Sequence, residues 1–185
     1  MGCSMSTVSK VKNPLKNGKP TTIDSSDITE NHKVLIKKTW KIVSNNMPSV
    51  GAKIFLRIFT IKPAIKHIFP FRDVTGDALL QNSHFRGHAS RFMQAVGAAV
   101  DNINALDTAM APLLFGLGQQ HTHYKGFSVE YFNVFSEAIK HVLEQELRSK
   151  FTPDVQAAWS KMIDFIIFKL TEGYCNNFDK HSPST

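Results

Sequence analysis

Apolar residues recur every three or four positions along most of the chain, and the strict alternation that is typical of strands is absent from the sequence. A first helix is expected from Thr29, a capping residue followed by Glu30 in the first turn, to Ser44. Pro48 suits the first turn of a second helix. We expect Pro63 to end that helix or to open a short further one.

The second half of the chain keeps the same helical period. A corner and loop over residues 68–76 lead to an amphipathic stretch from Leu79 to about Ile103, and a shorter helix is expected from Met110 to about Gln120. Ser128 is expected to cap a long helix through Leu147, and Thr152-Pro153-Asp154 is a strong helix start. The pattern predicts an all-α domain of six to eight helices.

The first 24 residues show no core-forming pattern, because they are rich in Ser, Thr, Lys, Pro and Gly. The first 20 residues hold four lysines and no acidic residue, within a chain whose net charge is +7, so an anionic membrane surface is the expected partner. The same segment has no aromatic residue and no arginine before residue 20, which argues against nucleic acid. The expected organisation is a flexible basic tail (1–24), one domain (25–178) and a short C-terminal tail (179–185).

Cysteine content and hydropathy exclude several classes of protein. Cys3 and Cys175 are the two cysteines of the 185 residues, too few for a disulfide framework. No apolar run reaches the roughly 20 residues that a membrane-spanning helix needs. The N-terminus lacks the apolar core of a secretion signal. We therefore expect an intracellular protein that reaches a membrane only if it carries a lipid.

Several residues between about Ile28 and Phe178 resemble, in their order and spacing, the pattern of the globin family. The run 86–93 is similar to the motif around the family's distal histidine. The spacing of Leu117, His121 and Tyr131 matches the frame of its proximal histidine. The remaining matches are two tryptophans of the first and last helices and a proline followed six residues later by a phenylalanine: Trp40, Trp159, Pro63 and Phe69.

This resemblance implies a globin fold that binds heme b. The heme is expected to be held without covalent thioether links to the protein, since the chain has no Cys-x-x-Cys-His motif. His121 corresponds to the proximal iron ligand, with the backbone carbonyl of Leu117 one turn earlier available to orient its ring. His88 corresponds to the distal residue, which either hydrogen-bonds a bound gas or ligates the iron directly. Phe69 corresponds to the phenylalanine that stacks on the heme.

His123 and His84 are rivals for the proximal and distal roles, but His121 and His88 fit the family frame better. A surface position is the alternative reading for His121, and a polar patch for His88.

Further side chains are expected around the heme. Phe55 and Phe92 fall where the family lines its distal pocket, and two phenyl rings there would leave little free volume and favour His88 as sixth ligand. The alternative is that both rings belong to the core. Arg91 and Lys125 are candidate cations for the heme propionates, since each combines a long apolar stem with a charge. A solvated surface position is the alternative for both.

The first six residues, Met1 to Ser6, fit an acylation signal. Gly2 matches the myristoylation pattern, and Cys3 beside it could carry a palmitoyl group. One myristoyl chain binds a membrane only marginally, so a second chain or the basic tail is needed for a firm hold.

Together these features resemble the six-coordinate, N-terminally acylated invertebrate globins, of the nematode kind, and the globin X group. The expected function is redox or electron-transfer chemistry and the binding of oxygen, nitric oxide or carbon monoxide at the cytoplasmic face of a membrane, with an unidentified electron donor or acceptor. One alternative is a reversible oxygen carrier or sensor with an open distal site, and another is a heme-free helical adaptor. Dedicated catalysis is not expected, beyond side reactions with nitrite or nitric oxide.

Overall fold

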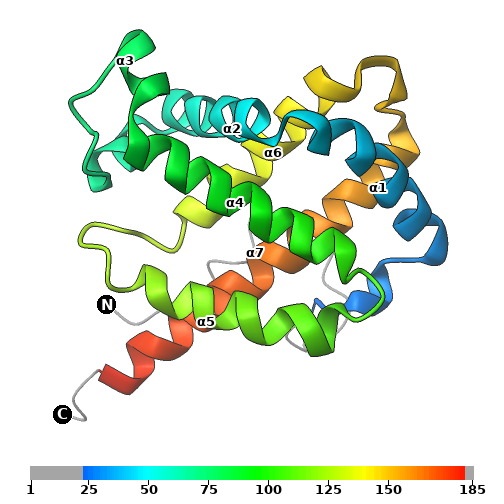
Figure 1. Ribbon diagram of the computed structural model, residues 1–185. Helices are drawn as coiled ribbons and strands as arrows, with labels where there is room; N and C mark the ends of the chain where they lie inside the picture. Colours follow the sequence, from blue (N-terminus) through cyan, green and yellow to red (C-terminus); the bar gives the residue numbers. More distant parts are fainter. Residues whose placement is uncertain (1–22, 182–185) are drawn as a thin grey trace.

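A computed structural model describes residues 23–181, and describes side chains as far as Asn176. Gly2, Cys3 and the basic tail up to residue 22 lie outside the described residues. Within the described range the regular structure is entirely helical, which confirms the predicted all-α class (Figure 1). The α-helices are α1 (Glu30–Val43), α2 (Met47–Ile61), α3 (Gly76–Gln81), α4 (Ser83–Asp101), α5 (Ala111–His121), α6 (Tyr131–Leu147) and α7 (Pro153–His181). Shorter helical turns are η2 (Ser25–Asp27), η3 (Ser44–Asn46), η4 (Pro63–Ile68), η5 (Leu106–Met110) and η6 (Arg148–Lys150).

Three predicted helix starts are confirmed. Thr29 caps α1, because its side-chain oxygen accepts a hydrogen bond from the backbone N–H of His32 at 3.3 Å. Pro48 lies in the first turn of α2. The hydroxyl oxygen of Thr152 accepts from the N–H of Val155 at 3.4 Å where α7 begins.

Two boundaries differ from the sequence prediction. The stretch from Leu79 to about Ile103 is not one helix, because Asn82 adopts an extended conformation and its side-chain oxygen accepts from the N–H groups of His84 and Phe85. Asn82 therefore ends α3 and caps α4. Ser128 does not cap α6, which begins only at Tyr131 after a turn. The prediction failed because backbone hydrogen bonds, which a sequence pattern does not reveal, hold the turn between Ser128 and Tyr131.

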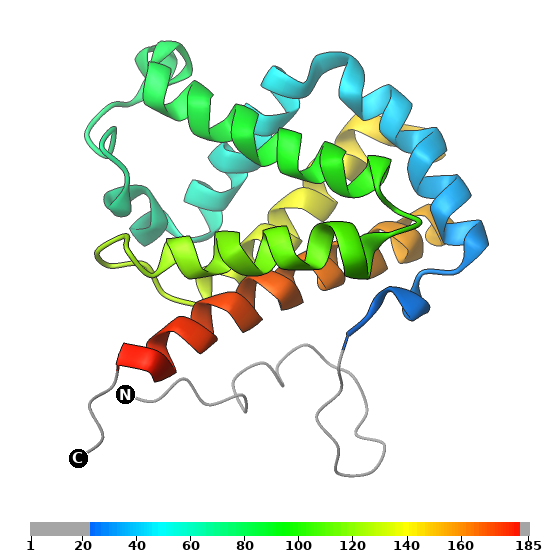
Figure 2. The ribbon, with the colours of Figure 1, turned by 60° about the horizontal axis from the view of Figure 1, so that its bottom comes forward.

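The helices enclose one main core. In this core the indole rings of Trp40 in α1 and Trp159 in α7 lie 6.2 Å apart, so the first and last helices meet. The helix α5 lies along α7, and these two helices form the most extensively packed pair. Figure 2 shows α4 on the opposite side of α5 from α7. Between residues 23 and 181 no helix is long and apolar enough to span a bilayer.

Candidate functional site

A cavity of about 220 Å³ lies between α4, α5 and the corner that follows α2. Its walls carry three histidines, His84 and His88 from α4 and His121 from the end of α5. The other lining residues are mostly apolar or aromatic: Ile65, Ile68, Phe69, Pro70, Phe71, Arg91, Tyr124, Phe127 and Phe135. The helix packing thus brings His88 and His121, 33 residues apart in the sequence, to the wall of one cavity.

The ring of His121 is fixed in one tautomer. Its Nδ1 atom lies 2.8 Å from the carbonyl oxygen of Leu117. Since a carbonyl oxygen only accepts hydrogen bonds, Nδ1 must carry the proton and donate it. Burial lowers the pKa of His121 and outweighs the opposite effect of this hydrogen bond. The ring is therefore held neutral, with a lone pair on Nε2 that can bind a metal ion.

His88 is held by aromatic rings alone. Its ring meets those of Phe55 and Phe69 edge-on, each at 4.9 Å between ring centroids. The imidazole makes no hydrogen bond with any residue that the structure describes. Burial, together with the nearby charge of Arg91, lowers the pKa of His88 to about 4. His88 is thus a second neutral imidazole on the cavity wall, and no described residue forms a hydrogen bond with it.

Two imidazoles alone do not complete a metal site. Among the described residues, no three His, Cys, Asp or Glu side chains come together as a metal site. An ion bound between His88 and His121 would need further ligands, which a cofactor can supply. His88 and His121 would hold the iron of a porphyrin, which would supply those ligands. The aromatic walls suit its flat ring, and Arg91 on the cavity wall suits its carboxylates.

Comparison with known proteins supports the same assignment. The sequence model of the Globin family matches residues 52–170. The chain belongs to the globin family. It is 27% identical over 157 residues to neuroglobin from Danio rerio, covering 84% of this chain and 98% of that protein. It is 30% identical over 149 residues to cytoglobin-2 from the same fish, covering 80% and 83%. It is 31% identical over 147 residues to hemoglobin subunit pi from Gallus gallus, covering 80% and 98%.

A solved structure shares the fold of this globin. It is the crystal structure, at pH 4, of a hexacoordinated heme protein from an anhydrobiotic tardigrade. The two superimpose with a TM-score of 0.74 at 26% identity, covering 79% of this chain and 94% of the other. The family and its helical fold are thereby confirmed, and heme b is the cofactor that the cavity fits.

Four of the predicted site residues line the cavity: His88, His121, Phe69 and Arg91. Phe55 stands behind His88, fully buried. Leu117 is not among the described residues that line the cavity, and it contributes to the site through the carbonyl oxygen that orients His121. Lys125 is exposed and is not among those lining residues either.

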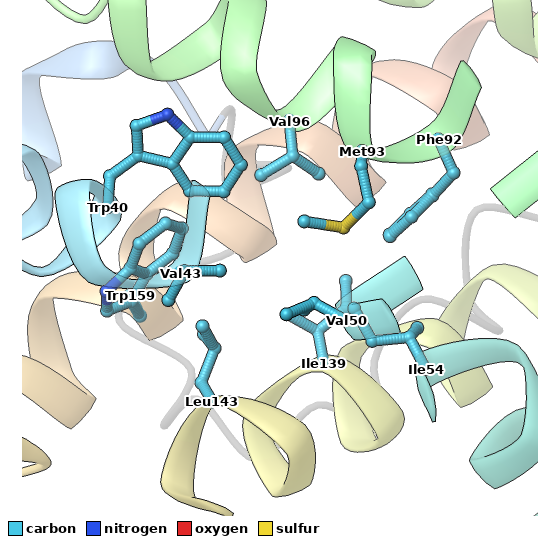
Figure 3. A pocket seen from close by; sticks show the side chains of 10 residues that line it. All are labelled: Trp40, Val43, Val50, Ile54, Phe92, Met93, Val96, Ile139, Leu143 and Trp159. Atoms are coloured by element: carbon cyan, nitrogen blue, oxygen red, sulfur yellow. The ribbon is translucent and has the colours of Figure 1, made fainter. Parts of the chain in front are cut away.

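Phe92 borders a different, smaller cavity of about 10 Å³, large enough for about one water molecule (Figure 3). Its ring also packs against Phe55 and Phe135, at 5.6 and 5.9 Å between centroids. The side chains around this small cavity are all apolar or aromatic: Trp40, Val43, Val50, Ile54, Phe92, Met93, Val96, Ile139, Leu143 and Trp159. Phe92 therefore lies between the aromatic residues beside the larger cavity and the main core.

The aromatic support of His121 was missed by the sequence reasoning. Phe127 and Phe132 approach its ring at 4.9 and 5.2 Å between centroids, and Tyr124 at 5.8 Å. These residues follow α5 through a turn in which Gly126 has a φ of 86°, a conformation that favours glycine. The signal available in the sequence was the density of aromatic residues directly after His121.

Proposed function

We propose that this globin binds heme iron through His121 and, at rest, through His88, and that it works in electron transfer or gas signalling at a membrane surface. The observation that carries the proposal is the pair of neutral imidazoles on one cavity wall, one with a fixed tautomer and one that forms no hydrogen bond with a described residue. The hexacoordinated state of the tardigrade protein supports the same arrangement.

The two histidines are suited to different tasks. His121 is oriented by Leu117 and enclosed by Phe127 and Phe132, so it is suited to hold the iron permanently. His88 is held only by ring contacts, which are weaker and less directional, so it can leave when a gas arrives. Bound heme supplies an iron that changes oxidation state and binds oxygen, nitric oxide or carbon monoxide. Retaining both imidazoles in both oxidation states keeps rearrangement small, which suits electron transfer.

An absorption spectrum of the purified ferrous protein tests this proposal. Sharp, split low-spin bands are expected, because His88 and His121 would both bind the iron. A broad five-coordinate band would instead favour the alternative function, a reversible oxygen carrier or sensor with an open distal site. The hemoglobin subunit among the relatives is the observation that keeps this alternative in view.

Two substitutions separate the roles of the histidines. His121→Ala is expected to abolish stable heme binding, whereas His88→Ala is expected to retain heme and to accelerate carbon monoxide association. An unchanged association rate in His88→Ala would count against the closed distal site. Absence of a Soret band from the purified, unsubstituted protein would point to a heme-free adaptor.

The membrane part of the proposal rests on the sequence alone. Acylation of Gly2 and Cys3, together with four lysines among the first 20 residues, would hold the domain at an anionic surface. Mass spectrometry of the protein from its own cells, and flotation with vesicles containing anionic lipid, test this. Gly2→Ala is expected to remove both the acyl mass and the flotation. Limited proteolysis tests the proposed division into residues 1–24, 25–178 and 179–185.

A further inference from the structure

Two glycines bring the backbones of α5 and α7 into direct contact. A β-carbon built on Gly118 would lie 2.0 Å from the carbonyl oxygen of Leu170. One built on Gly173 would lie 1.9 Å from the carbonyl oxygen of Phe115. Both obstructing atoms belong to the backbone, so no side-chain rotation relieves the overlap. The contact is reciprocal, because each glycine meets the carbonyl three positions before the other glycine.

This glycine contact lies beside the groups that fix the proximal imidazole. Gly118 directly follows Leu117, whose carbonyl oxygen accepts the hydrogen bond from His121, four residues beyond Leu117 in α5. A short helical segment moves as a unit, so a shift of Gly118 carries His121 with it. Figure 2 shows α5 lying between α7 and α4. The spacing of α5 from α7 therefore governs how far His121 projects toward His88.

We propose that Gly118 and Gly173 are positioning residues that set the depth of His121 in the heme cavity. This inference rests on the proposed role of His121 as an iron ligand. Glycine is unfavourable inside a helix, so its presence at both sides of the crossing needs a reason beyond helix formation. Close approach of the two backbones supplies that reason. A methyl group at either position pushes α5 away from α7 and toward α4.

The test compares three alanine substitutions in full-length holoprotein that also carries His88→Ala, so that His121 is the only protein ligand on the iron. The measurement is the iron–imidazole stretching frequency of the ferrous form. Gly118→Ala and Gly173→Ala are expected to shift it. Gly116→Ala is the matched control on the same helix, because a β-carbon there meets no atom of the described residues within 4 Å apart from the neighbouring backbone of α5 itself. Its frequency is expected to stay unchanged, and equal frequencies in all three variants overturn the inference.

A second background separates positioning from general damage to the pocket. In protein that carries both His88→Ala and His121→Gly and is supplied with free imidazole, the imidazole on the iron would no longer be attached to α5. Gly118→Ala is then expected to leave the frequency unchanged, and a persistent shift overturns the inference. If His121→Gly without imidazole keeps the unsubstituted spectrum, His121 is not the ligand, and the proposed function itself fails.

A third measurement applies if Gly118→Ala and Gly173→Ala do not fold. Amide hydrogen exchange is followed in His121→Gly holoprotein with free imidazole, where the iron no longer holds α5. The amides of residues 117–120 are expected to exchange as slowly as those of residues 170–173 of α7, since Gly118 meets Leu170 at the crossing. Fast exchange confined to α5 would show that the glycine contact does not hold this helix in place.

Discussion

The ring of His88 lies edge-on against the ring of Phe55, with centroids 4.9 Å apart and planes inclined at 78°. Phe55 is 1% exposed and also contacts Phe69, Phe92 and Phe135, so the whole cluster resists movement of His88 away from the cavity. Under the proposed function, this cluster helps to hold His88 toward the iron.

Phe55→Leu is expected to loosen His88 and to accelerate carbon monoxide association. An aromatic pair contributes about 0.5–1.5 kcal/mol, which corresponds to an increase of about two- to twelvefold if departure of His88 limits the rate. The measurement is rapid mixing of the ferrous protein with carbon monoxide. Phe59→Leu is the control, because Phe59 contacts Phe55 and Phe69 but makes no described ring contact with His88. Equal acceleration in both variants would contradict a specific role for Phe55.

Heme retention is expected to depend on Arg91 more than on Lys125, because Arg91 lines the cavity and Lys125 does not. Arg91→Leu should raise the rate of heme loss about two- to fivefold, as befits one exposed ion pair. Lys125→Leu should leave the rate nearly unchanged. Transfer of heme to an excess of a heme-free acceptor protein measures both rates. A larger increase in the rate of heme loss in Lys125→Leu than in Arg91→Leu would place the propionates nearer to Lys125 than to Arg91.

The apoprotein is expected to lose stability as the pH falls from about 6.5 toward 4. The unfolded chain protonates His88 near its ordinary pKa of 6.5, whereas burial lowers the pKa in the folded chain to about 4. The unfolded state therefore binds more protons in this interval, and the loss attributable to His88 is at most about 3 kcal/mol.

Denaturant unfolding of heme-free protein at several pH values measures this loss. His88→Leu is expected to make the decline shallower. Some decline should remain, because burial also lowers the pKa of His121. An identical pH dependence in the two proteins would mean that His88 does not resist protonation.

A buried hydrogen bond between α1 and α7 is expected to contribute measurably to folding. The indole N–H of Trp159 donates to the hydroxyl of Thr39 at 2.9 Å, and this hydroxyl in turn donates to the carbonyl of Leu35 at 2.7 Å. Thr39→Val leaves the indole N–H buried without a partner and should lower the free energy of unfolding by about 1–3 kcal/mol. Chemical denaturation of the holoprotein measures the change.

Thr60→Val is the matched control, since the exposed hydroxyl of Thr60 donates only to the carbonyl of Leu56 within its own helix. Its effect should be small, because water can replace that bond. Similar losses of unfolding free energy in both variants would show that the buried hydrogen bonds contribute no more to stability than the exposed one.

Local sequence patterns determined three of the helix starts and the orientation of His121. Thr29, Pro48 and Thr152 act on the N–H groups of their own first turns. The bond from His121 to Leu117 spans one turn of a single helix, so its geometry follows once the helix is identified. Such features require no knowledge of how helices cross.

Tertiary structure alone decided what each side chain finally faces. It placed Phe92 at the small core cavity, left Lys125 exposed, and surrounded His121 with Phe127 and Phe132. It also brought Gly118 against the backbone of Leu170. These relationships depend on the crossing of helices that are distant in the sequence. The helical period specifies which face of each helix is apolar, but not which apolar partner that face will meet.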